Sequence, residues 1–71
     1  MKLGLHARDQ QNLAGQILNK ADSVVGFARL AGISPGAVHG ALRGDLLRAR
    51  TAKKIASALD AKLLNVFEWR K

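Results

Sequence analysis

The feature that most constrains the fold is a stop-and-restart signal, Gly32-Ile-Ser-Pro35. Glycine readily adopts the left-handed conformation that ends a helix, whereas serine followed by proline caps and begins one. Apolar residues at helical spacing precede this signal and also follow it as far as Gly44. The segment therefore predicts a short second helix that stops at Gly32 and a third helix over 35–43, joined by a tight turn.

Capping residues define the beginning of the chain in the same way. Asp9 is placed to cap a first helix over about 9–20, in which Leu13 and Ile17 lie on one apolar face. Asp22 or Ser23 can accept a hydrogen bond from the free N–H groups at the start of the second helix. We expect both helices to contribute to the core.

Beyond Gly44, apolar spacing predicts a fourth helix from about Arg48 or Arg50 to Leu59. The segment 63–69 contains five large apolar side chains and could equally contain a β-strand. Because no Gly or Pro interrupts it, we expect a short fifth helix. The predicted fold is a single all-α domain over residues 1–71.

Composition limits the function classes. The chain has 71 residues, no cysteine, and a formal charge of +7 from 12 Lys and Arg against 5 Asp and Glu. We expect no roomy cleft in a domain this small, and the basic excess indicates a polyanionic partner. A charge used only for solubility, or for binding ribosomal RNA, is the alternative reading.

Catalytic and metal-binding chemistry lack supporting motifs. His6 and His39 are too few to form a metal site of recognisable spacing without cysteine. The hydroxyl side chains have no positioned base or phosphate-binding loop beside them. We expect no enzyme activity, no cofactor and no metal. No apolar stretch suggests a signal peptide or membrane span, so a soluble, cytoplasmic protein is the expectation.

The two central helices carry a small-glycine-apolar pattern, Ala28-x3-Gly32-x5-Val38. Ala28 is small enough for two helices to cross closely, Gly32 redirects the chain, and Val38 fills the wedge between the helices. With the segments 51–59 and 64–67, this stretch resembles the Cro and lambda-repressor family of helix-turn-helix regulators. The motif would span about 24–43.

The resemblance implies a compact five-helix, lambda-repressor-like fold and a function. The third helix would enter the major groove of double-stranded DNA, and a homodimer would bind a pseudo-palindromic operator. The implied role is a sequence-specific transcriptional repressor of phage or plasmid type.

Within that resemblance, the exposed positions of the third helix are the candidate base contacts. His39 and Arg43 have the reach to donate to base edges, with guanine the natural target of arginine. The polar residues often found at the start of this helix in the family are replaced here, so direct base reading is expected to be sparse. The candidates are Ser34, Pro35, Gly36, His39, Gly40 and Arg43.

A second group is expected to touch phosphate, because cations cluster where the family contacts the DNA backbone. Lys2 and Arg8 could form a flexible arm that reaches DNA, although a disordered basic terminus is the commoner outcome. The candidate phosphate contacts are Ser23, Arg48, Arg50, Lys53 and Lys54.

The apolar carboxyl end is the expected dimer interface, since so small a domain cannot easily bury all its large side chains. Its candidate residues are Leu63, Leu64, Phe67 and Trp69. Two alternatives stay open. An antitoxin would bind a small protein partner as well as DNA, and a structural nucleic-acid-binding protein would use charge alone.

Overall fold

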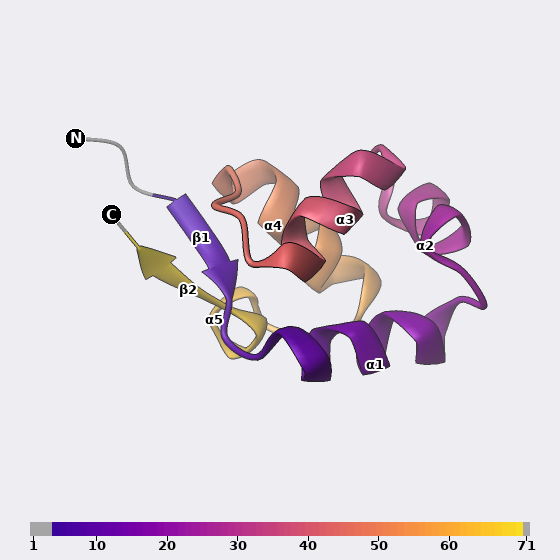
Figure 1. The fold of residues 1–71 in the computed structure, drawn as a ribbon, viewed down its shortest axis with the longest axis horizontal. Coiled ribbons are helices and arrows are strands. Elements are labelled where there is room, and N and C mark those ends of the chain that lie inside the picture. Colours follow the sequence, from indigo (N-terminus) through magenta and orange to yellow (C-terminus); the bar gives the residue numbers. More distant parts are fainter. Residues whose placement is uncertain (1–3, 71) are drawn as a thin grey trace.

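A computed structural model describes residues 4–70, and these form a mostly helical domain with a small two-stranded sheet (Figure 1). Both described ends of the chain lie at one end of the molecule, whereas α2 lies at the other. The elements in chain order are β1 (Gly4–Ala7), α1 (Gln10–Lys20), α2 (Val24–Ala31), α3 (Pro35–Arg43), α4 (Ala49–Ala58), α5 (Leu63–Val66) and β2 (Phe67–Arg70).

The first four helices confirm the predicted boundaries to within a residue or two, because their ends depend on local capping. Asp9, Ser23 and Ser34 each accept a hydrogen bond from the backbone N–H three residues later. Gly32 and Gly44 end α2 and α3 in the left-handed conformation, with φ of 74° and 84°. The capping side chains therefore fix where these short helices begin, and the glycines fix where α2 and α3 end.

The expected fifth helix is wrong beyond Val66. The chain leaves the helix there and forms β2, which pairs antiparallel with β1 so that Ala7 lies opposite Phe67 and Gly4 opposite Arg70. No Gly or Pro is needed at this transition, since a neighbouring strand offers the backbone hydrogen bonds that a helix would otherwise supply. The strand Gly4–Ala7 was not predicted at all.

The core joins the sheet to the helices. Phe67 from β2 and Leu5 from β1 are both fully buried, in one cluster with residues of all four longer helices. Leu5 also exchanges two backbone hydrogen bonds with Leu47, which fixes the loop before α4 against the sheet. The largest fully buried side chains are Phe27, Phe67, Leu5, Leu13, Ile17, Ile55 and Val38.

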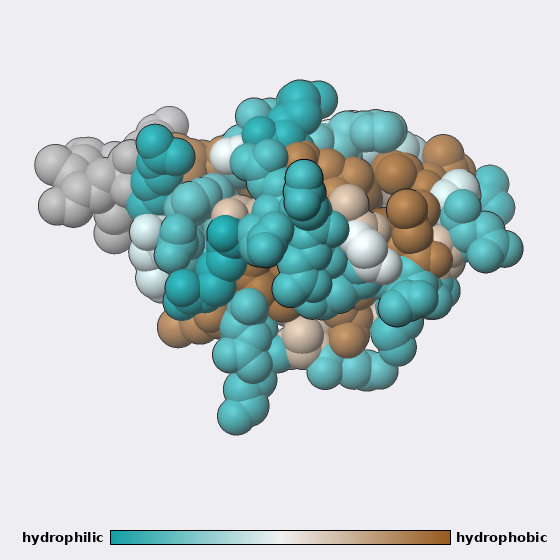
Figure 2. All heavy atoms as spheres, turned by 60° about the horizontal axis from the view of Figure 1, so that its bottom comes forward, coloured by the Kyte–Doolittle hydropathy of each residue, from teal (hydrophilic) through white to brown (hydrophobic). Residues whose placement is uncertain are grey.

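The outward face of α1 is mostly hydrophilic, as Figure 2 shows for the side of the molecule that carries this helix. Apolar surface appears toward the α2 end of that view, and Leu18, Val25 and Leu30 are exposed side chains of α1 and α2. None of the helices in the described range 4–70 has the length and apolar character needed to cross a membrane.

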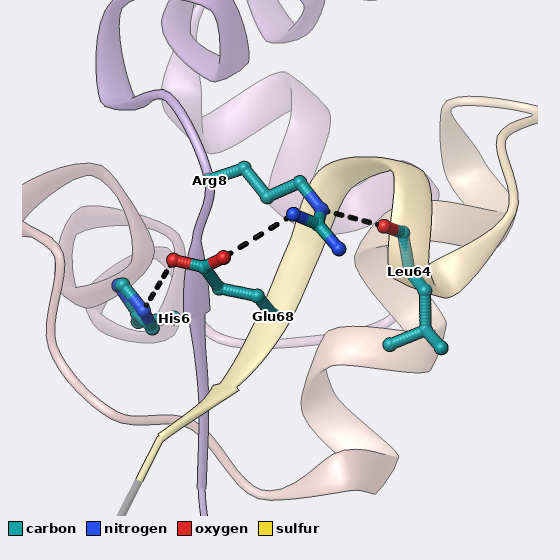
Figure 3. Close-up of polar contacts among 4 residues, drawn as sticks. All are labelled: His6, Arg8, Leu64 and Glu68. Atoms are coloured by element: carbon teal, nitrogen blue, oxygen red, sulfur yellow. Dashed lines mark hydrogen bonds and ion pairs between the residues drawn. The ribbon is translucent and has the colours of Figure 1, made fainter.

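A polar cluster ties the two ends of the chain together (Figure 3). The Arg8 Nε donates to the Leu64 carbonyl at 2.7 Å, and its Nη1 lies 3.2 Å from one carboxylate oxygen of Glu68. The other oxygen lies 3.0 Å from the His6 Nε2. Arg8 is therefore part of the folded domain and not a flexible arm. Lys2 lies outside the described residues.

Candidate nucleic-acid interface

The turn between α2 and α3 has the geometry that the spacing predicts. At the end of α2, the Gly32 N–H donates to the Arg29 carbonyl at 3.2 Å and the Ile33 N–H donates to the Ala28 carbonyl at 3.0 Å. These bonds satisfy carbonyls that would otherwise lack partners. Ser34 Oγ then accepts from the Ala37 N–H at 3.2 Å and starts α3. The turn is thus short, with a capping bond on either side of it.

The inward faces of α2 and α3 lock the two helices together. Phe27, Val38 and Ala41 are fully buried and Ala28 is 1% exposed, all in the same core cluster. A small residue at position 28 lets the helices approach, and the branched Val38 side chain fills the space between them. The burial of Ala28 and Val38 agrees with the pattern, and the shared core packs α3 against α2.

The opposite face of α3 is open to solvent at most of the candidate base-contact positions. Ser34, Pro35, Gly36, His39 and Arg43 are exposed. The expectation that Gly40 is exposed is wrong, since it is buried, and a Cβ there would lie 3.5 Å from a carboxylate oxygen of Asp45. Gly40 is therefore removed from the candidate base contacts.

Asp45 is the residue that the sequence reasoning missed. Its carboxylate lies 2.8 Å from the Arg43 Nη2, and its N–H donates to the Gly40 carbonyl at 3.0 Å. Both charged side chains are more than half exposed, so water screens the pair and it contributes little to stability. The signal available in the sequence was an acid two residues beyond Arg43 across the Gly44 turn.

The cations expected to contact phosphate form no ion pairs within the described residues. The described residues include ten Lys and Arg side chains, of which only Arg8, Lys20 and Arg43 form ion pairs. Four of the remaining seven fall within residues 48–54, and all four are exposed: Arg48, Arg50, Lys53 and Lys54. The positive charge is therefore concentrated at the start of α4.

The backbone at the start of α4 adds to this charge. No side chain caps this helix and its first turn has no acidic residue, so its leading N–H groups are open to an anion. Ser23, at the start of α2, is exposed and its Oγ accepts from the Gly26 N–H at 3.0 Å. Its hydroxyl hydrogen can still be donated to a phosphate oxygen.

The expected dimer-interface residues are divided by the fold. Phe67 is fully buried in the core, which removes it from any interface, and Leu63 is half-buried against the same core. Leu64 and Trp69 are exposed, at 49% and 52%. The correction follows from β2, which turns Phe67 inward beneath the sheet.

Within residues 4–70, the His, Asp and Glu side chains form no group of three that could hold a metal ion. The candidate site combines hydrogen-bond donors on α3, among them His39 and Arg43, with the cations at the start of α4. Comparisons of the chain with protein-family models, curated proteins and solved structures gave no match.

Proposed function

We propose that the chain is a helix-turn-helix DNA-binding protein that acts as a transcriptional repressor, with α3 in the major groove. The observation that carries the proposal is the position of α3. Its buried face is packed against α2, its exposed face presents His39 and Arg43, and the next helix begins with exposed cations that have no acidic partner in the described range. Such a helix can enter a groove while the cations contact phosphate.

The division of labour follows from side-chain chemistry. His39 and Arg43 are the exposed α3 side chains with the reach to donate to base edges. The Arg43 contact with Asp45 is solvent-screened, so a guanine edge or a phosphate can replace it. The four cations of residues 48–54 and the open N–H groups of α4 would bind the DNA backbone irrespective of sequence. Two copies would bind a pseudo-palindromic operator.

The test is selection from a random pool of DNA at physiological salt, followed by titration of the enriched site against scrambled DNA. A two-fold symmetric site with half-sites about ten base pairs apart is the expected result. Equal, strongly salt-dependent binding to every sequence would replace the proposal with a charge-driven nucleic-acid binder.

Residue variants then assign the roles. Arg43→Ala should weaken operator binding and, if Arg43 reads a base, relax preference at one position by roughly 1–3 kcal/mol. Arg29→Ala is the matched control, because Arg29 is an exposed arginine on α2 without an ion pair among residues 4–70. A uniform loss across sequences for Arg43→Ala would assign this side chain to phosphate.

A further inference from the structure

The outer edge of β2 has no neighbouring strand in the described part of the chain. β1 lies along one edge of β2, and α5 directly precedes β2 in the chain. β1 itself is covered on both sides, because Leu5 on its other edge pairs with Leu47. In Figure 1 no helix or strand lies outside β2 at this end of the molecule. An open edge strand is a template for pairing with another strand.

The direction of the backbone groups on this edge follows from the known hydrogen bonds. The Leu5 N–H and carbonyl both bond to Leu47, at 2.9 and 2.7 Å, so they point away from β2. Trp69 lies opposite Leu5 in the antiparallel register. Such a pair is not hydrogen-bonded, and the Trp69 N–H and carbonyl therefore point outward, away from β1. The Arg8 N–H bonded to the Val66 carbonyl, at 2.9 Å, fits the same alternation.

Trp69 gives the open edge an apolar side chain. It is 52% exposed, although it shares the face of the sheet on which Leu5 is completely buried. The Phe67 N–H on the same edge already donates to the Leu63 carbonyl. Trp69 is thus the residue of Phe67–Arg70 that presents both an outward backbone donor and acceptor and a large side chain that packing has left half-covered.

The charges beside Trp69 complement themselves under two-fold symmetry. In an antiparallel pair of two β2 strands with Trp69 opposite Trp69, Glu68 of each copy, whose carboxylate also contacts His6 and Arg8 of its own chain, lies opposite Arg70 of the other. Sliding the strands by two residues in either direction, which keeps the same side chains on each face, instead sets Glu68 against Glu68 or Arg70 against Arg70. Opposite charges across strands stabilise such a pair and like charges destabilise it. One register is therefore preferred.

We propose that β2 pairs antiparallel with β2 of a second copy of this chain, in the register that sets Trp69 opposite Trp69. Each Trp69 donates its N–H to the other's carbonyl, and the two small sheets become one continuous four-stranded sheet. This pairing supplies the interface of the dimer in the proposed function and rests on that function only for its biological role. So short an edge predicts a weak dimer, with a dissociation constant on the order of micromolar or higher.

The test is sedimentation of the free protein across a concentration series, with no DNA present. Trp69 is the single tryptophan and the chain has no tyrosine, so its emission should shift to the blue as the dimer forms. Trp69→Pro removes the outward N–H without breaking a bond to β1, and Trp69→Val keeps that N–H while removing the ring. We expect Trp69→Pro to dimerise at least ~10-fold more weakly than Trp69→Val.

Charge reversal tests the register. Arg70→Glu sets like charges opposite each other and should weaken dimerisation several-fold, whereas Arg29→Glu makes the same charge change on α2 and should not. A wild-type protein that stays monomeric up to several hundred micromolar overturns the pairing. Equal effects of Trp69→Pro and Trp69→Val, or of the two charge reversals, also overturn it.

DNA titration separates this inference from the proposed function. Trp69→Pro should still bind an isolated half-site like the wild type but lose the added affinity for the full site. If the protein dimerises through β2 but prefers no DNA sequence, the repressor proposal is rejected and the pairing stands. Cooperative full-site binding that survives in Trp69→Pro would reject the pairing and keep the repressor proposal.

Discussion

Three glycines inside helices, Gly15, Gly36 and Gly40, allow protein stability to be separated from DNA binding. A Cβ at Gly15 would meet nothing within 4 Å, and one at Gly36 would meet only the Ser34 Oγ, at 3.9 Å. At Gly40 the nearest atom would be an Asp45 carboxylate oxygen at 3.5 Å, an ordinary contact. None of the three has a positive φ. Alanine therefore fits at each position.

The expected stability changes follow from backbone entropy. Alanine in place of glycine inside a helix stabilises by roughly 0.5–1 kcal/mol, which we expect for Gly15→Ala in α1 and Gly40→Ala in α3. Gly36 is the second residue of α3, where the gain should be smaller. In a domain of this size ~1 kcal/mol raises the melting temperature by about 4–8 °C. Thermal unfolding followed by circular dichroism measures each shift.

DNA affinity should respond differently. If the start of α3 lies against the groove, the extra methyl group of Gly36→Ala should weaken operator binding about 10-fold, or ~1.4 kcal/mol. Gly15→Ala, which lies on the exposed face of α1, is the control and should leave binding unchanged. Equal operator affinity for these two variants would contradict the placement of the start of α3 against the DNA groove. A lower melting temperature for Gly40→Ala would mean that the new methyl group clashes, and would contradict the 3.5 Å spacing to the Asp45 carboxylate.

Three other outcomes follow from burial and charge. Ala28→Leu should overpack the crossing of α2 and α3 and cost about 1–3 kcal/mol in urea unfolding; an unchanged midpoint would contradict the close approach at Ala28. Phe67→Ala should lower the free energy of unfolding by about 3–5 kcal/mol because the ring is fully buried, whereas Trp69→Ala should destabilise the monomer far less. Similar losses for the two variants would contradict the burial of Phe67. Lys53→Ala should weaken binding to all DNA sequences and reduce the salt slope by about 1, and an unchanged slope would remove Lys53 from the phosphate contacts.

The candidate site could be predicted from sequence only in part. The exposure of His39 and Arg43 follows from helical spacing, since positions opposite the buried Val38 and Ala41 must face outward. The burial of Gly40 could not be predicted that way. It depends on how Asp45 folds back beyond the end of α3, and a helical pattern contains no information about the chain after its last turn.

Local chemistry in the sequence determined where the first four helices begin and end. Asp9, Ser23 and Ser34 cap helices through bonds to N–H groups three residues away, and Gly32 and Gly44 end helices through their own φ angles. Each of these interactions lies within a few residues, so the pattern alone is sufficient to predict it.

Only the tertiary structure decided the sheet and, with it, the exposed edge at Trp69. The segments Gly4–Ala7 and Phe67–Arg70 lie at opposite ends of the chain, and neither has a partner until the helices between them pack. An isolated short strand has no stability of its own, because its hydrogen bonds belong to the pair. The conformation of residues 67–70 is therefore a property of the folded chain, and their local sequence is compatible with either helix or strand.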